Sequence, residues 1–191
     1  MKKFLVLMLA LGIAIVGFSS LSTAQAATSD TFQITVTVSY LSIELLDVGD
    51  ADYTTWDVGT VETSSVSTMS GTAGTLGQQG IHVKNASSVP IDLGSQVTAQ
   101  TTTWTFSSSA GDNTCALRAK SFTGWQSAEY PDMSTDTAVI NNSTPVNVTP
   151  DGSSVPAAAS RYLYYQLTTP SDFTTSSAEN EIEVTITATK P

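Results

Sequence analysis

The sequence contains little of what disulfide-stapled folds and metal centres are built from: one cysteine and one histidine among 191 residues. A single cysteine excludes an intramolecular disulfide, and one residue of each type is too few for a zinc site, whose four ligands come mostly from cysteine and histidine. Cys115 shares strand parity with Leu117 and Ala119. We therefore expect it to face inward as a small apolar residue rather than to act as a nucleophile.

The single histidine gives little support for catalysis. His82 alternates with Ile81 and Val83, which places its side chain on the outward face of a predicted strand. No nucleophile motif of the G-x-S-x-G kind accompanies it, and pairs of acidic residues that would suit a glycosidase lack a supporting context. The sequence therefore predicts that the protein is not an enzyme.

Basic residues are also scarce, with 7 Lys and Arg against 17 Asp and Glu and a net charge of −10. Such a surface repels polyanions at long range, which argues against nucleic acid and anionic lipid as partners. The acidic surface has a simple explanation in solubility, and cation binding is the alternative. Only 13% of the residues are charged, and Ser and Thr take their place on the predicted strand surfaces, where threonine is favoured.

The one long hydrophobic run lies at the N-terminus. Lys2 and Lys3 precede an apolar stretch over residues 4–18, and Ala24-Gln25-Ala26 provides a small-residue cleavage site. This arrangement predicts a secretory signal peptide over residues 1–26, since the run is shorter than the roughly 20 residues that cross a bilayer. A retained, uncleaved anchor is the alternative. We expect an exported protein, secreted to the periplasm, the cell surface or the extracellular space, without membrane association after cleavage.

The remaining residues, 27–191, alternate between apolar and polar side chains with a period of two and show no long helical period. Turn-forming residues separate short candidate strands, and the phase changes near Tyr40-Leu41, which indicates a bulge or bend. This pattern predicts one all-β domain, an antiparallel β-sandwich of immunoglobulin-like or jelly-roll type. The candidate strands are 32–38, 56–61, 81–84, 91–97, 102–106, 114–122, 138–141, 146–149, 161–168 and 181–189.

An acidic, glycine-containing loop is the candidate metal site. Asp47, Asp50, Asp52 and Asp57 lie within one loop and its flanking strand, and carboxylate oxygens are the ligands that Ca²⁺ prefers. The spacing does not match an EF-hand. A solvated acidic loop without a bound ion is the alternative, and no other cofactor is expected.

Aromatic side chains supply the candidate ligand site. Tyr162 and Tyr164 share one face of a strand whose other face carries Leu163 and Tyr165, and Trp125 lies in a loop. Trp125, Tyr162 and Tyr164 are therefore predicted to form a platform on which a carbohydrate stacks. The alternative is that this face is the covered second side of a sheet.

The two ends of the predicted domain carry the clearest strand patterns, at 32–38 and 181–188. The simpler interpretation pairs these strands within one sandwich. The other is strand addition, in which the N-terminal strand of one subunit completes the sheet of the next. Head-to-tail contacts of that kind propagate filaments.

Segment 83–93, with sequence VKNASSVPIDL, resembles the strand-turn-strand of bacterial extracellular immunoglobulin-like domains, and the N-x-S match at Asn85 within it predicts a surface turn. Residues 104–106 and 165–167 resemble the W-x-L pattern of bacterial surface proteins, although neither triplet holds both Trp and Leu. The resemblance implies a fold and a compartment. The sequence as a whole therefore predicts a structural or adhesive surface protein, which associates with itself or with other surface proteins, and a carbohydrate- or calcium-binding module is the alternative.

Overall fold

The computed structural model describes residues 39–74, 78–101, 103–172 and 181–191, all within the unit that spans 38–191. The described residues form ten β-strands and no helix, which confirms the all-β prediction. The predicted signal peptide, 1–26, and the predicted first strand, 32–38, lie outside the described residues. The strands are β1 Ile43–Leu46, β2 Val66–Thr68, β3 Ile81–Asn85, β4 Asp92–Gln100, β5 Thr105–Phe106, β6 Thr114–Phe122, β7 Ala138–Ile140, β8 Val146–Asn147, β9 Ser160–Thr168 and β10 Ile182–Thr189.

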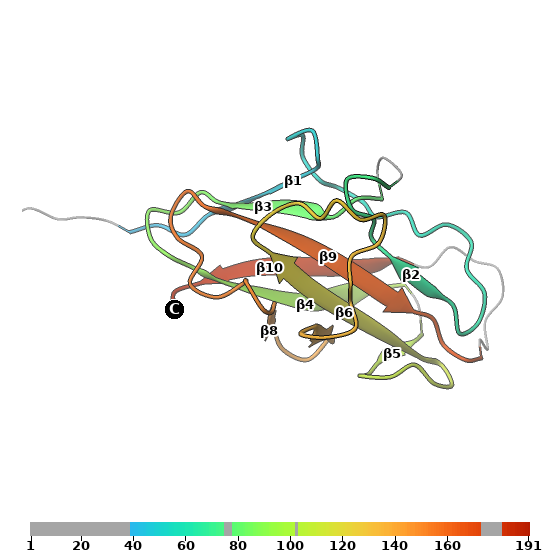
Figure 1. Cartoon of the computed structure of the whole chain (residues 1–191). Helices are drawn as coiled ribbons and strands as arrows, with labels where there is room; N and C mark the ends of the chain where they lie inside the picture. The colour runs from blue at the N-terminus through green and yellow to red at the C-terminus, as the bar shows by residue number, and fades with distance from the viewer. Residues whose placement is uncertain (1–38, 75–77, 102, 173–180) are drawn as a thin grey trace, which may run out of the picture. The chain divides into compact units, whose positions relative to one another are not determined.

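The strands are divided between two sheets (Figure 1). The larger sheet has the order β1-β3-β9-β6-β5, with β2 beside β9 and β7 beside β6, and the smaller has the order β10-β4-β8. Every pair of named strands is antiparallel except β5 with β6. This arrangement is consistent with the predicted β-sandwich.

Along one side of the unit, the two sheets contact each other through short edge strands. β7, at an edge of the larger sheet, contacts β8 and β4 of the smaller sheet. On the opposite side, the larger sheet ends in β1 and the smaller sheet ends in β10. We call these the β7–β8 side and the β1–β10 side.

The core lies between the sheets because alternate side chains of each strand point inward. Leu93 and Val97 of β4 and Leu163 of β9 are at most 2% exposed. A buried hydrogen bond also links the sheets, since Ser95 Oγ of β4 and Tyr165 Oη of β9 are 2.7 Å apart. Cys115 is fully buried, as predicted.

Asn85 corrects one expectation from the sequence. The predicted surface turn places its side chain in solvent, whereas the residue is 1% exposed in the structure. Its amide nitrogen donates towards the carbonyls of Val89, Val155 and Pro156, at 2.9–3.1 Å, and its amide oxygen accepts from the Ser87 amide. The side chain therefore satisfies buried backbone groups between β3 and the segment that precedes β9.

One predicted strand is absent and another is shorter than predicted. Residues 56–61 form no strand, whereas the weakly patterned stretch after them contains β2. Of the predicted strand 102–106, the described residues 103–106 contain only the two residues of β5, which run parallel to β6. β2 lies in a stretch where Ser, Thr and Gly are frequent, so the apolar alternation that marks a strand is weak there.

Candidate functional site

Burial changes sharply at the β1–β10 side. Val83 of β3 and Val97 of β4 are 1% and 2% exposed, but their cross-strand neighbours in the edge strands, Leu45 and Val184, are only partly buried. Other inward-facing apolar side chains along both edge strands also pack against the core but remain partly exposed. We name this set the open seam: Ile43 and Leu45 of β1, and Ile182, Val184, Ile186 and Ala188 of β10.

The open seam includes a free strand edge. Among the described strands β10 pairs only with β4, so its other edge has no partner strand. β1 pairs only with β3, but the end of its other edge is bonded by its own following loop, through the Leu46–Asp52 bridge and the amide of Tyr53, which donates to the carbonyl of Leu45. Natural edge strands usually carry lysine, proline or a bulge that discourages pairing with another chain. Within Ile182–Thr189 there is neither lysine nor proline, although a register irregularity lies between Glu183 and Val184. The central and C-terminal part of β10 therefore remains able to accept a further strand.

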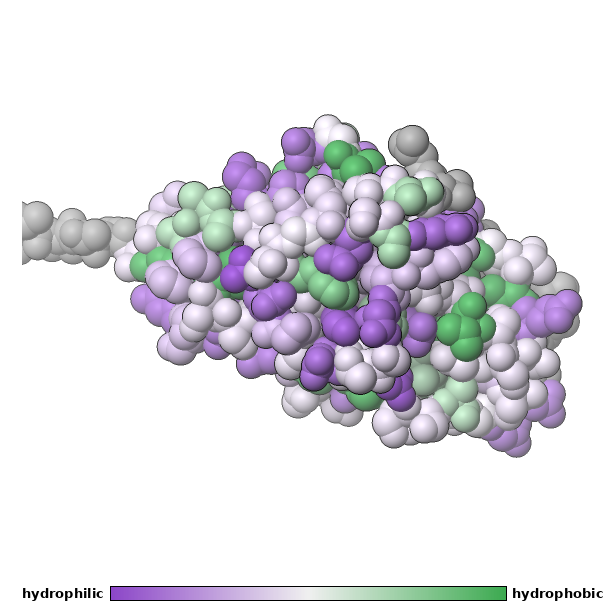
Figure 2. Space-filling view, in the orientation of Figure 1, coloured by the Kyte–Doolittle hydropathy of each residue, from purple (hydrophilic) through white to green (hydrophobic). Residues whose placement is uncertain are grey.

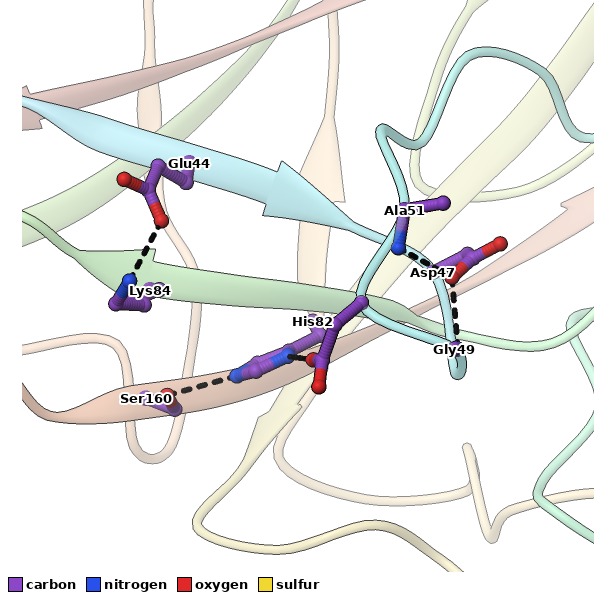
Figure 3. Close-up of polar contacts among 8 residues, drawn as sticks. Glu44, Asp47, Gly49, Ala51, His82, Lys84 and Ser160 are labelled. Atoms are coloured by element: carbon purple, nitrogen blue, oxygen red, sulfur yellow. Dashed lines mark hydrogen bonds and ion pairs between the residues drawn. The ribbon is translucent and has the colours of Figure 1, made fainter.

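A polar cluster lies on the outward face of the larger sheet, where cross-strand register places His82 of β3 beside Tyr162 of β9. The two rings stack, with centroids 5.0 Å apart. The His82 ring bridges two elements, because Nδ1 lies 3.0 Å from Asp50 Oδ1 and Nε2 lies 2.8 Å from Ser160 Oγ (Figure 3). Asp50 has a φ of 61°, a left-handed conformation that is uncommon outside glycine.

This hydroxyl–imidazole–carboxylate order is the order of groups that activates a serine nucleophile in acyl-transfer enzymes. The sequence search missed it because Asp50 and Ser160 are 32 and 78 residues from His82 and no local motif marks them. In those enzymes the carboxylate is buried, whereas the Asp50 side chain is 76% exposed and therefore well hydrated. We interpret the cluster as a clasp that ties the loop after β1 to β9.

Beside this clasp, an exposed ion pair joins β1 to β3. Lys84 Nζ lies 2.8 Å from Glu44 Oε2 (Figure 3), and the two residues are directly opposite in the strand register. The hydrogen bond and the charge of Glu44 raise the pKa of Lys84. The pair fixes a cross-strand contact but contributes little stability, because solvent screens it.

The four predicted calcium ligands do not converge. Asp47 Oδ1 accepts hydrogen bonds from the amides of Gly49 and Ala51 within its own turn (Figure 3), Asp57 Oδ1 accepts one from Gly59, and Asp50 contacts His82. Asp52 is exposed at the end of the same loop. Across the described ranges no three Asp, Glu, His or Cys side chains form a group that could hold a metal. The calcium site remains a prediction without support from this geometry.

The predicted aromatic platform is assembled but partly covered. Trp125 packs against both tyrosines, with ring centroids 4.7 Å from Tyr162 and 6.5 Å from Tyr164. Tyr164 is 0% exposed, and its hydroxyl accepts a hydrogen bond from the Gln126 amide at 3.0 Å. Burial also raises the pKa of Tyr164. Tyr164 therefore supports the loop that carries Trp125, and only Trp125 and Tyr162 are partly open to solvent.

A separate hollow of about 350 Å³ lies beside β2. Tyr130 and Val66 on its wall are 61% and 59% exposed. The hollow combines two aromatic rings with a carboxylate, an amide and hydroxyls, and its lining is Trp56, Asp57, Val58, Val66, Ser67, Thr68, Gln78 and Tyr130. Sequence reasoning did not find it because Trp56 and Tyr130 come from loops far apart in the chain.

The face of the molecule seen in Figure 2 has no single dominant hydrophilic or hydrophobic region. Figure 2 shows strongly hydrophilic residues interspersed with near-neutral ones and with small, separate hydrophobic patches. In the part of the chain that the structure describes, no helix is long and apolar enough to cross a membrane. No family model matches the chain, and no curated protein and no solved structure matches it either.

Proposed function

We propose that the protein is an exported structural or adhesive component of the cell surface, the periplasm or the extracellular space, and that it acts by associating with copies of itself. The observation that carries the proposal is the open seam, in which the edge strands β1 and β10 bring six partly exposed apolar side chains to one side of the unit, and the outer edge of β10 has no partner among the described strands. Burying apolar surface is the main favourable contribution to protein association. An added strand would cover these side chains and pair the free backbone edge in one step.

The sequence adds three supports. The N-terminal segment has the features of a signal peptide, and we propose that it is removed on export. The resemblance of residues 83–93 to extracellular immunoglobulin-like domains favours that type of sandwich and that compartment. The excess of acidic over basic residues disfavours a role in binding nucleic acid or an anionic membrane.

The test is to purify the mature chain, residues 27–191, and measure its mass in solution by light scattering as its concentration is raised. In parallel, antibody labelling of intact and permeabilised cells locates the native protein. We expect multimers and exported protein. A chain that stays monomeric at every concentration would contradict the structural role, and a cytoplasmic location would contradict export.

A second candidate function is carbohydrate binding, which is favoured by the hollow beside β2 rather than by the predicted platform. Sugar rings stack on aromatic faces while planar polar side chains bind their hydroxyls, and Trp56, Tyr130 and Asp57 offer both kinds of contact. A glycan array followed by calorimetry tests it. Tyr130→Ala should abolish binding and Trp125→Ala should leave it intact, whereas the reverse result would assign binding to the predicted platform.

A further inference from the structure

We propose that the open seam receives residues 32–38 of a second copy as an added antiparallel strand, so that copies join head to tail. This inference rests on the proposed self-association and names the segment and the acceptor strands that would bring it about. The acceptor strands are β1 at the edge of the larger sheet and β10 at the edge of the smaller sheet.

Residues 32–38, FQITVTV, have the pattern of a strand that could cover the open seam. Phe32, Ile34, Val36 and Val38 share one face of a strand, whereas Gln33, Thr35 and Thr37 share the other. The apolar face can cover the open seam while the polar face remains in solvent. Seven residues of extended chain span about 23 Å at roughly 3.3 Å per residue, and β10 has 8 residues, so the lengths match. The segment carries no charge and no proline that would interfere with pairing.

The direction of the strands favours a second copy over the same copy. In Figure 1 the described chain begins at the end of the unit where the C-terminus also lies; β1 runs away from that end and β10 runs towards it. A segment directly upstream of β1 can reach β10 of its own copy only by reversing direction, and it then lies parallel to β10. A segment from another copy can approach antiparallel, which is the more stable pairing per residue.

This geometry also determines how copies assemble. A donated strand that runs antiparallel to β10 begins at the end of the acceptor where its C-terminus lies and runs along the open seam to the opposite end, where the donor's own unit then follows. Each copy therefore donates at one end and accepts along its open seam, and its orientation is repeated in the next copy. Such heterologous contacts do not close on themselves unless the rotation between copies forms a ring, so they lead to open filaments.

The first test compares two double variants of the mature chain that differ only in strand parity. Ile34→Asp with Val36→Asp places charges on the predicted apolar face, and Thr35→Asp with Thr37→Asp places the same charges on the polar face. We expect the first variant to be monomeric by light scattering and the second to assemble like the wild type. Assembly of the first variant, or equal loss of assembly in both, would overturn the proposal.

The second test separates donor from acceptor by mixing two variants. Ile186→Lys blocks the seam, and its partly exposed position lets the lysine extend to solvent so that the unit can fold; circular dichroism and a thermal melt verify this. Each variant alone should be monomeric, and a one-to-one mixture of Ile186→Lys with Ile34→Asp/Val36→Asp should form only heterodimers. A mixture that remains monomeric overturns the donated strand.

The results also distinguish this inference from the proposed function. A wild-type chain that never assembles refutes self-association as a whole. A wild-type chain that assembles while Ile34→Asp/Val36→Asp also assembles refutes only the seam. A wild-type monomer whose melting temperature falls in Ile34→Asp/Val36→Asp but not in Thr35→Asp/Thr37→Asp indicates that each copy fills its own seam, and it overturns the exchange between copies.

Discussion

The two long sides of the unit differ in how completely they bury the apolar side chains of the shared core. On the β7–β8 side, short strands and the segments around them close the gap between the sheets, and Ile140 and Val148 are 0% exposed. On the β1–β10 side, Ile43 and Ile186 contact the same core but remain partly exposed. Among the described residues, one side is therefore covered and the other is only partly covered, and this difference is the basis of the proposed assembly.

The largest expected difference between the two sides is in the free energy of unfolding. Ile140→Ala should lower it by about 2–5 kcal/mol, because truncation of a fully buried side chain loses its transfer free energy and leaves a cavity. Ile186→Ala should lower it by about 1 kcal/mol in the dissociated chain, since a partly exposed side chain has less burial to lose. Urea denaturation measures both. Equal losses would show that the β1–β10 side is covered as well as the β7–β8 side.

The buried groups between the sheets predict a loss of stability in alkaline solution. Burial raises the pKa of Tyr165 to about 12 and that of the Cys115 thiol to about 11, from ordinary values of 10.0 and 9.0. Both groups are neutral when protonated, so their contributions are complete below pH 9 and are lost as the unfolded chain ionises, over pH 9–11 for Cys115 and pH 10–12 for Tyr165. Each group should reduce the unfolding free energy by roughly 1.4 kcal/mol per pH unit within its window.

Denaturation midpoints measured between pH 7 and pH 11 test this expectation. Cys115→Ser is unsuitable because it buries a new hydroxyl, so Cys115→Ala serves as the variant that removes the thiol, with Tyr165→Phe for the phenol. Each should flatten the alkaline decline, and Tyr165→Phe should also lower stability at neutral pH by about 1 kcal/mol through loss of its bond to Ser95. A decline that is unchanged in both variants would assign the effect to other groups.

Removing the clasp at His82 should lower stability moderately, and the local loosening should be limited to the loop after β1. His82→Ala removes two hydrogen bonds and the contact with Tyr162, and it should cost about 1–2 kcal/mol of unfolding free energy. Hydrogen exchange should quicken in residues 47–52 rather than in β4. Ser160 should remain unlabelled by a fluorophosphonate probe; labelling that disappears in His82→Ala would instead identify an activated serine.

The smallest effect is expected at the exposed ion pair. Glu44→Gln and Lys84→Gln, alone or together, should leave the thermal midpoint within error of the wild type, because both side chains are nearly half exposed and solvent screens the pair. These variants are therefore controls for β1. A clear loss would show that β1 depends on this contact more than on its apolar face.

Strand identity was largely predictable where alternation was strong. Residues 114–122 were placed with the observed bounds of β6, and the predicted strand 161–168 differs from β9 by one residue. The local alternation of side chains does not indicate which strands pair with each other. The prediction of a surface turn at Asn85 failed because its three carbonyl partners include Val155 and Pro156, which a local motif cannot reveal.

The candidate sites were harder to predict for the same reason. Parity correctly grouped Tyr162 with Tyr164, but it could not show that the loop at Gln126 covers Tyr164. The four aspartates are close in sequence, yet local hydrogen bonds to Gly49, Ala51 and Gly59 occupy two of them. The open seam depends on the order of strands in both sheets, and period-two alternation carries no information about that order.

The most direct test of the account is hydrogen exchange of mature Ile34→Asp/Val36→Asp chain with and without a synthetic peptide of residues 28–38. We expect the peptide to slow exchange along β10 and to leave β7 and β8 unchanged, because the partly exposed apolar side chains that it would cover lie in β1 and β10. Exchange along β10 that stays the same at saturating peptide, or protection that appears on the β7–β8 side instead, would contradict it.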